Sequence, residues 1–242
     1  MEKDELVIGG VHFSSRFILG TGKTSRYTRE LIESAVRDAG TEMISVAINK
    51  LDDEDSGLKM IPENVRVLPN TLGAHTAEEA IEMAHFSRKR GLGDFIKIEI
   101  LHDDSFLLPD NEETCEATKI LAKEGFLAMP YFYPDLISAA ELEKAGAAAI
   151  MPLASPSGSN KGLQTRDFIA DMIGKVNIPI IVDAGIGRPS QACEAMEIGC
   201  DAIMANTALA TADNLPLMAR AFKNAIDAGH LAYLSRDTKT DS

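Results

Sequence analysis

The sequence predicts an α/β fold, a (β/α)8 barrel of the TIM type with a short N-terminal β-hairpin, formed by one domain over residues 1–242. Three observations lead to this prediction. The length of 242 residues is typical of such barrels. Short apolar runs rich in β-branched residues alternate with longer segments of helical period, which indicates parallel strands joined by crossover helices. Eight such runs occur, at the spacing of about 30 residues that a barrel repeat needs.

The eight predicted strands are short. They cover residues 16–20, 43–48, 65–70, 95–101, 126–131, 148–153, 179–185 and 201–207. Two segments between them carry helix start signals, Thr76 with Glu79 and Asp110 with Glu113, in which the first side chain can accept hydrogen bonds from open N–H groups. An open doubly wound sheet also alternates strands and helices. Eight repeats in a chain of this length favour the closed barrel.

The two ends of the chain are expected to lie outside the repeats. The opening LVIGGVHFSSRF has a Gly-Gly turn between two apolar pieces, which predicts a hairpin at about residues 6–17 that covers the barrel floor. The polar segment at about residues 232–242 is expected to be a mobile tail.

Composition excludes several classes of protein. The chain is 45% hydrophobic with a formal net charge of −13, which excludes disordered and collagen-like chains and argues against nucleic acid or anionic membranes as partners. No run approaches the roughly 20 apolar residues of a membrane span, and the acidic start MEKDEL lacks the features of a secretory signal. A cytoplasmic location is therefore expected.

Neither a disulfide framework nor a metal site is expected. The candidate ligands lack the spacing of metal sites, and they are Cys115, Cys193, Cys200, His75, His85 and His102.

The predicted fourth strand, FIKIEIL, carries two charges on one face. Because side chains alternate along a strand, Ile96, Ile98 and Ile100 share the face that packs on helices. Lys97 and Glu99 then point into the barrel, about 7 Å apart along the strand. In an apolar barrel a lysine loses its proton more easily and can attack a ketone, while a nearby carboxylate moves protons. An internal ion pair that only stabilises the barrel is the alternative.

The last strands end in residues suited to a small anion. Asp183 shares a face with Ile181 and stands at the carboxyl end of the seventh strand, where barrel active sites form. A role as a cap or loop anchor is the alternative for Asp183. Gly185 and Gly187 allow a ligand close to the backbone, and the helix start after Pro189 is expected to supply N–H groups for an anion.

Two neighbouring loops extend the same rim. Asn206 and Thr207 follow the eighth strand, and the loops after strands seven and eight often bind phosphate. Gly158 lies in the SPSGSNKG stretch after the sixth strand, where it can adopt a conformation that leaves N–H groups open, although a simple flexible loop fits as well. The residues predict an enzyme that holds a small phosphorylated carbohydrate and attacks its carbonyl with Lys97.

A set of ordered motifs resembles the thiazole synthase family of thiamin biosynthesis. The motifs are GTGK (20–23), LPNTLGAHTAEEA (68–80), IKIEI (96–100), LLPD (107–110), KEGF (123–126), AIMPLASPSGS (149–159), IPIIVDAGIGRPSQA (178–192) and ANTALATADNLP (205–216). Together they cover nearly the whole chain and are specific in combination, whereas any one block could occur in another phosphate-binding barrel.

The resemblance implies a transferase that makes the thiazole phosphate from 1-deoxy-D-xylulose 5-phosphate, dehydroglycine and sulfur from the thiocarboxylate of a small ubiquitin-like carrier protein. Lys97 matches the lysine that forms an imine with the sugar ketone, and Glu99 and Asp183 match the carboxylates that transfer protons. The family's sugar-phosphate contacts fall on Gly158, Ala184, Gly185, Asn206 and Thr207. The resemblance implies no cofactor and no metal, and a homo-oligomer, specifically a tetramer.

The sequence departs from the family pattern in two places. Asn49 and Lys50, in AINKLDDED after the second strand, stand where many members carry two arginines, and this change can alter substrate placement, carrier docking or subunit contacts. The tail RDTKTDS lacks the common Ser- and Pro-rich extension. A lysine-imine aldolase for phosphorylated sugars and a non-catalytic phosphosugar-binding barrel therefore stay as alternatives.

Overall fold

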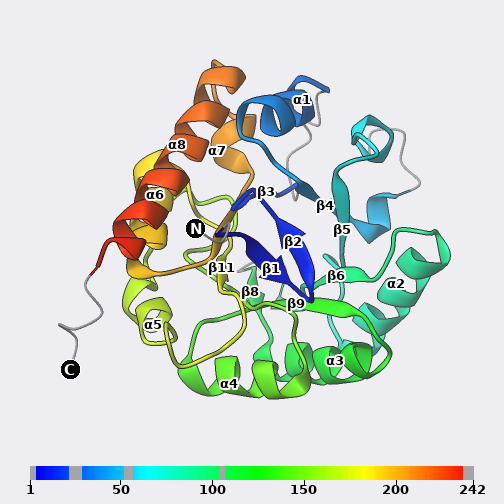
Figure 1. The fold of residues 1–242 in the computed structure, drawn as a ribbon. Helices are drawn as coiled ribbons and strands as arrows, with labels where there is room; N and C mark the ends of the chain where they lie inside the picture. Colours follow the sequence, from blue (N-terminus) through cyan, green and yellow to red (C-terminus); the bar gives the residue numbers. More distant parts are fainter. Residues whose placement is uncertain (1–3, 22–28, 52–56, 104–106, 237–242) are drawn as a thin grey trace.

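The computed structural model describes residues 4–21, 29–51, 57–103 and 107–236. Eight parallel strands stand at the centre of the molecule with helices around them (Figure 1). The strands are β3 (Phe17–Leu19), β4 (Met43–Ala47), β5 (Arg66–Asn70), β6 (Phe95–Ile98), β9 (Leu127–Phe132), β10 (Met151–Pro152), β11 (Ile181–Val182) and β12 (Ala202–Ala205).

The strands pair in the order β10-β9-β6-β5-β4-β3-β12-β11. Parallel bridges from Ile150 to Ile180 and from Leu153 to Asp183 join the first and last strands of this order and close the ring. Each strand lies within its predicted run, except that β9 continues one residue further to Phe132. The predicted (β/α)8 barrel is therefore confirmed.

Helices follow the strands and cover the outside of the barrel. They are α1 (Arg29–Asp38), α2 (Ala77–Lys89), α3 (Asn111–Lys123), α4 (Leu136–Ala145), α5 (Arg166–Ala170), α6 (Pro189–Ile198), α7 (Thr207–Ala210) and α8 (Leu215–Leu234), with 3-10 turns η1 (Ile48–Lys50) and η2 (Leu58–Met60). The side chain of Thr76 accepts from the N–H of Glu79, and that of Asp110 from Glu112 and Glu113, as the start signals predicted. In the described part of the chain no helix is long and apolar enough to cross a membrane.

The N-terminal hairpin closes one end of the barrel. Strands β1 (Leu6–Ile8) and β2 (Val11–Phe13) pair antiparallel and cross the centre of the ring in Figure 1. Leu6, Ile8 and Phe13 are buried in the same apolar cluster as interior residues of the barrel strands, including Met129 and Ile181. The predicted hairpin is thus confirmed.

A second hairpin and the end of the last helix add to the eight βα repeats. A second hairpin, β7 (Leu101–Asp103) with β8 (Leu108–Pro109), follows β6. At the other end of the chain, residues 232–234 were expected in a tail but belong to α8, which ends at Leu234. Residues 237–242 of the expected tail lie outside the described residues.

The two faces of β6 have the predicted environments. Ile96, Ile98 and Ile100 are fully buried in a cluster with apolar residues of the covering helices. These partners are Ala80 and Ala84 of α2 and Ala117 and Leu121 of α3. Lys97, by contrast, faces the barrel interior and lines its cavity, with Glu99 beside it.

Candidate active site

A cavity of ≈ 220 Å³ opens at the carboxyl ends of the strands, the face on which barrel active sites lie. Lys97 and Glu99 reach it from β6 and the residue beyond, and the other lining residues come mostly from loops after β5, β10, β11 and β12. All eight residues predicted from the sequence line this one cavity, and they are Lys97, Glu99, Gly158, Asp183, Ala184, Gly185, Asn206 and Thr207.

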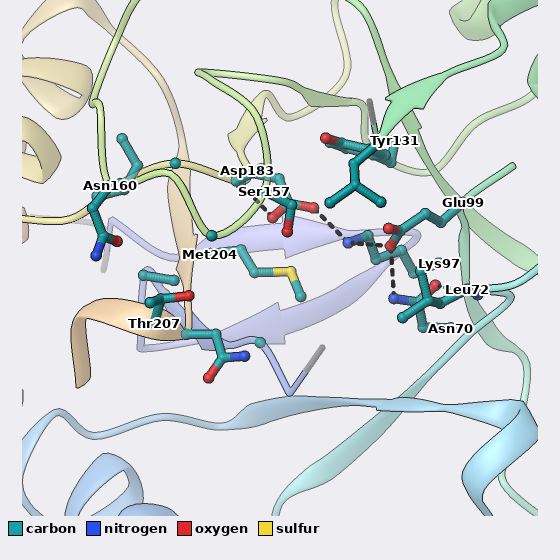
Figure 2. Close-up of a pocket in the computed structure, with 18 residues that line it drawn as sticks. Asn70, Leu72, Lys97, Glu99, Tyr131, Ser157, Asn160, Asp183, Met204 and Thr207 are labelled. Atoms are coloured by element: carbon teal, nitrogen blue, oxygen red, sulfur yellow. Dashed lines mark hydrogen bonds and ion pairs between the residues drawn. The ribbon is translucent and has the colours of Figure 1, made fainter. Parts of the chain in front are cut away.

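Lys97 contacts two carboxylates at the inner end of the cavity. Its Nζ lies 2.6 Å from Oδ2 of Asp183 and 3.0 Å from Oε2 of Glu99, and the dashed lines in Figure 2 mark these contacts. The three side chains are each 10% exposed or less. Asp183 comes from the end of β11, which is not adjacent to β6 in the barrel, so it reaches Lys97 across the interior.

Each carboxylate is held by a further hydrogen bond. Asn70, the last residue of β5, donates its amide Nδ2 to Oε2 of Glu99 at 2.8 Å and accepts the N–H of Leu72 at 2.9 Å. The N–H of Ala184 donates to Oδ1 of Asp183 at 2.6 Å. Sequence reasoning missed Asn70, although a polar residue at the end of a buried strand was a signal that could have found it.

Charge pairing sets the protonation of Lys97. Burial alone lowers the pKa of Lys97, but the charges and hydrogen bonds of Asp183 and Glu99 outweigh burial, and the net effect raises the pKa above its usual value. The lysine is therefore an ammonium at rest. The expectation that an apolar surround makes Lys97 lose its proton easily is wrong, because two carboxylates touch the amine.

Asp183 is a carboxylate of raised pKa in contact with the lysine. Burial raises the pKa of Asp183 most, Lys97 opposes this change, and the charge of Glu99 raises the pKa further, so the net pKa stays above the usual value. Since Asp183 also makes the shorter contact with Nζ, it is the nearest acceptor for the lysine proton.

The rim of the cavity has an unusual backbone. Gly158 and Gly185 have φ of 79° and 74°, and Ala184 has φ of 59°, a conformation that costs a residue with a side chain about 1 kcal/mol or more. A Cβ on Gly185 would lie 1.8 Å from Oγ of Ser155. Glycine is required there by the packing of two rim loops as well as by φ.

A side chain of the first turn of α6 binds the backbone just before the helix. Oε1 of Gln191 accepts the N–H groups of Gly187 and Arg188 at 2.8 and 3.0 Å. The N–H groups just before Pro189 therefore have a partner within the chain, and the expectation that the helix start after Pro189 supplies N–H groups for an anion stays a prediction.

Asn49 and Lys50, which stand where many family members carry arginines, follow β4, and Asn49 contacts a residue that lines the cavity. Nδ2 of Asn49 donates to the carbonyl of Leu72 at 3.1 Å, and Leu72 lines the cavity. Lys50 is the last residue of η1, and residues 52–56 of the acidic loop lie outside the described residues. Among the described residues, no group of three or more His, Cys, Asp or Glu side chains is placed to hold a metal ion.

Comparison with known proteins gives the family. The model of the family described as thiazole biosynthesis protein ThiG matches residues 7–242. The chain belongs to this thiazole synthase family of thiamin biosynthesis. A thiazole synthase of Clostridium beijerinckii is 58% identical over 97% of this chain and 91% of its own length, and one of Fusobacterium nucleatum is 56% identical over the same shares.

A solved structure extends the likeness to three dimensions. The chain is similar to a structure described as the Amycolatopsis orientalis BexX/CysO complex, with a TM-score of 0.85 and 32% identity over 98% of both chains. The family assignment makes the chain an enzyme of thiazole formation, in agreement with the resemblance found in its motifs.

Proposed function

We propose that this member of the thiazole synthase family forms thiazole phosphate from 1-deoxy-D-xylulose 5-phosphate, dehydroglycine and sulfur from a carrier-protein thiocarboxylate, through an imine on Lys97. The observation that supports the imine most directly is the contact of one buried amine with two carboxylates inside a cavity. An amine that attacks a ketone needs an acceptor for its proton within reach.

The first step uses the ammonium of Lys97 and the ketone. The ammonium gives a proton to Asp183 across 2.6 Å, and the neutral amine then attacks the ketone carbon and forms a C–N bond. The ketone oxygen leaves as water after its C–O bond breaks. Two of the three ammonium protons depart with this water and one stays on the iminium nitrogen, so no outside acid is needed.

Proton transfer after imine formation falls to the two carboxylates. The iminium acidifies the neighbouring carbon, and Glu99 and Asp183 move protons so that the carbonyl shifts along the sugar chain before the sulfur adds and the ring closes. Asn70 supports this role because its amide keeps Glu99 directed toward Lys97.

The sugar phosphate is assigned to the opposite side of the cavity. Figure 2 shows Thr207 on the side away from Glu99. Since a protein with net charge −13 does not attract a phosphate through its overall field, local N–H groups and hydroxyls must hold it. The proposed contacts are Gly158, Ala184, Gly185, Asn206 and Thr207, which all line the cavity.

The proposed partners are a small ubiquitin-like sulfur carrier protein and further copies of the chain. That BexX was solved in a complex with CysO supports a carrier partner. Exposed apolar side chains on α4 and α8, such as Ile137 at 75% and Leu231 at 66% exposure, support a homo-oligomer, for which we propose a tetramer. A cytoplasmic location belongs to the same proposal and is supported by the family.

Borohydride trapping tests the imine. Reduction of the protein with 1-deoxy-D-xylulose 5-phosphate should add the sugar to the peptide that contains Lys97. Lys97→Ala should abolish the adduct, whereas Lys161→Ala, on the loop after β10, should leave it unchanged. An adduct on any other lysine of the unaltered protein would contradict the assignment.

Carrier dependence then separates the competing reactions. Thiazole should form only when the carrier thiocarboxylate and dehydroglycine are present. Cleavage of the sugar phosphate without the carrier would indicate an aldolase instead. Trapping without any product would indicate a non-catalytic binding barrel.

A further inference from the structure

Tyr131 is a buried residue of the cavity to which the proposed reaction gives no role. It lies on β9 and is 1% exposed, yet it lines the cavity beside Lys97. Its hydroxyl oxygen is buried and has no hydrogen-bond partner among the described residues.

An unpartnered buried hydroxyl is unusual because it loses its bonds to water without replacement. Nearly all buried polar groups in proteins find a partner, and an unsatisfied one costs about 1–3 kcal/mol. A purely apolar phenylalanine would avoid this cost at the same size. Because the residue lines a cavity, a ligand that enters the cavity can supply the missing partner.

The position of Tyr131 points to the reacting carbonyl. Nζ of Lys97 lies 5.0 Å from the centre of the Tyr131 ring, and Figure 2 shows the ring above the contact of Lys97 with Asp183. A ketone carbon within reach of this amine would lie in the part of the cavity that the Tyr131 ring borders.

Charge explains why a phenol suits this oxygen. Negative charge develops on a ketone oxygen during attack, and a neighbouring carboxylate such as Asp183 or Glu99 disfavours that charge. Asn70, an uncharged donor on the adjacent strand, already donates its amide to Glu99. Burial, with smaller effects of Asp183 and Glu99, raises the pKa of Tyr131 well above its usual value, so the phenol keeps the proton that it donates.

We propose that the Tyr131 hydroxyl is a further catalytic group, which donates a hydrogen bond to the ketone oxygen as Lys97 attacks and to the hydroxyl that then leaves as water. Tyr131 stays neutral throughout, and the protons of the departing water still come from the Lys97 ammonium. The inference rests on the lysine imine proposed above and adds the donor that stabilises its formation.

The variant Tyr131→Phe tests the proposal because it removes only the hydroxyl. The rate constant of imine formation at saturating 1-deoxy-D-xylulose 5-phosphate, followed by timed borohydride quench and intact mass, should fall at least about tenfold. The melting temperature should stay equal or rise, since the lost hydroxyl has no partner in the protein. The dissociation constant for inorganic phosphate should not change.

Tyr133→Phe is the matched control, because Tyr133 lies two residues along the chain with 43% exposure. It should form the imine at the unaltered rate. A Tyr131→Phe protein that forms the imine as fast as the unaltered protein, melts lower or binds phosphate more weakly would overturn the proposal. If the unaltered protein itself forms no imine, the proposed function fails first and this inference fails with it.

Discussion

Replacing Lys97 with methionine should destabilise the folded protein at neutral pH and much less in acid. Methionine fills similar space but removes the cation that separates Asp183 from Glu99. Both carboxylates touch the same nitrogen, at 2.6 and 3.0 Å, so their oxygens lie within about 6 Å of each other. Two negative charges at that distance repel by about 3 kcal/mol at an effective dielectric constant of about 20.

The sign of the pH dependence follows from Asp183. Burial already raises the pKa of Asp183 above its usual value of 3.8, and Lys97 opposes that change. Without Lys97 the pKa is raised further. A carboxyl whose pKa is raised in the folded state contributes stability below its unfolded pKa, and this stability is lost as pH rises through the folded pKa. The deficit of the variant therefore grows from acid toward neutral pH.

Urea unfolding followed by circular dichroism measures this effect. We expect the free energy of unfolding of Lys97→Met to lie about 3 kcal/mol below that of the unaltered protein at about pH 8, with a smaller deficit at about pH 5. The double variant Lys97→Met with Glu99→Gln should recover most of the loss, since one carboxylate is gone. Equal deficits at both pH values, or no recovery in the double variant, would refute the reasoning.

Two further variants test the site. Asp183→Asn should keep the borohydride-trapped adduct on Lys97, because losing that charge eases deprotonation of the amine and Glu99, at 3.0 Å from Nζ, can accept the proton in place of Asp183. The variant should nevertheless lose most thiazole formation measured by chromatography, and full turnover would make Asp183 a structural anchor. Gly185→Ala should lower the free energy of unfolding in urea by at least about 2 kcal/mol, because a Cβ at this position meets Ser155. Gly158→Ala should lower it by only about 1 kcal/mol, because a Cβ there meets nothing within 4 Å. Equal losses in the two variants would show that the loops relax.

The barrel could be predicted from the sequence because its signals are local. A period of two in FIKIEIL is enough to place Ile96 and Ile98 against helices and Lys97 inside the barrel, and the observed clusters agree. The count of apolar runs gives the number of strands. Since parallel strands of a barrel end on one face, residues that follow different strands could also be assigned to one cavity.

The side-chain contacts between different segments could not be predicted from these local patterns. The side chain of Gln191 accepts the N–H groups of both Gly187 and Arg188, a contact that no strand or helix pattern in the sequence indicates. In the sequence, Tyr131 is the last residue of a predicted apolar strand. Its position beside Lys97 depends on the pairing of β9 with β6. Pattern alone assigns a residue to a face without giving its neighbour on that face.

The protonation of Lys97 depends on its neighbours across the barrel, which the strand pattern does not give. The isoleucines on either side of Lys97 suggest an amine that burial has made neutral, and burial does lower its pKa. The charge of Asp183, which lies 86 residues further along the chain, contributes with Glu99 enough to reverse the net effect. A chain with a neutral residue at 183 would have the same strand pattern around Lys97, but its lysine would lose the proton more easily. The protonation of this lysine is thus determined by the contact across the barrel, and the proposed imine can form only after a carboxylate accepts the lysine proton.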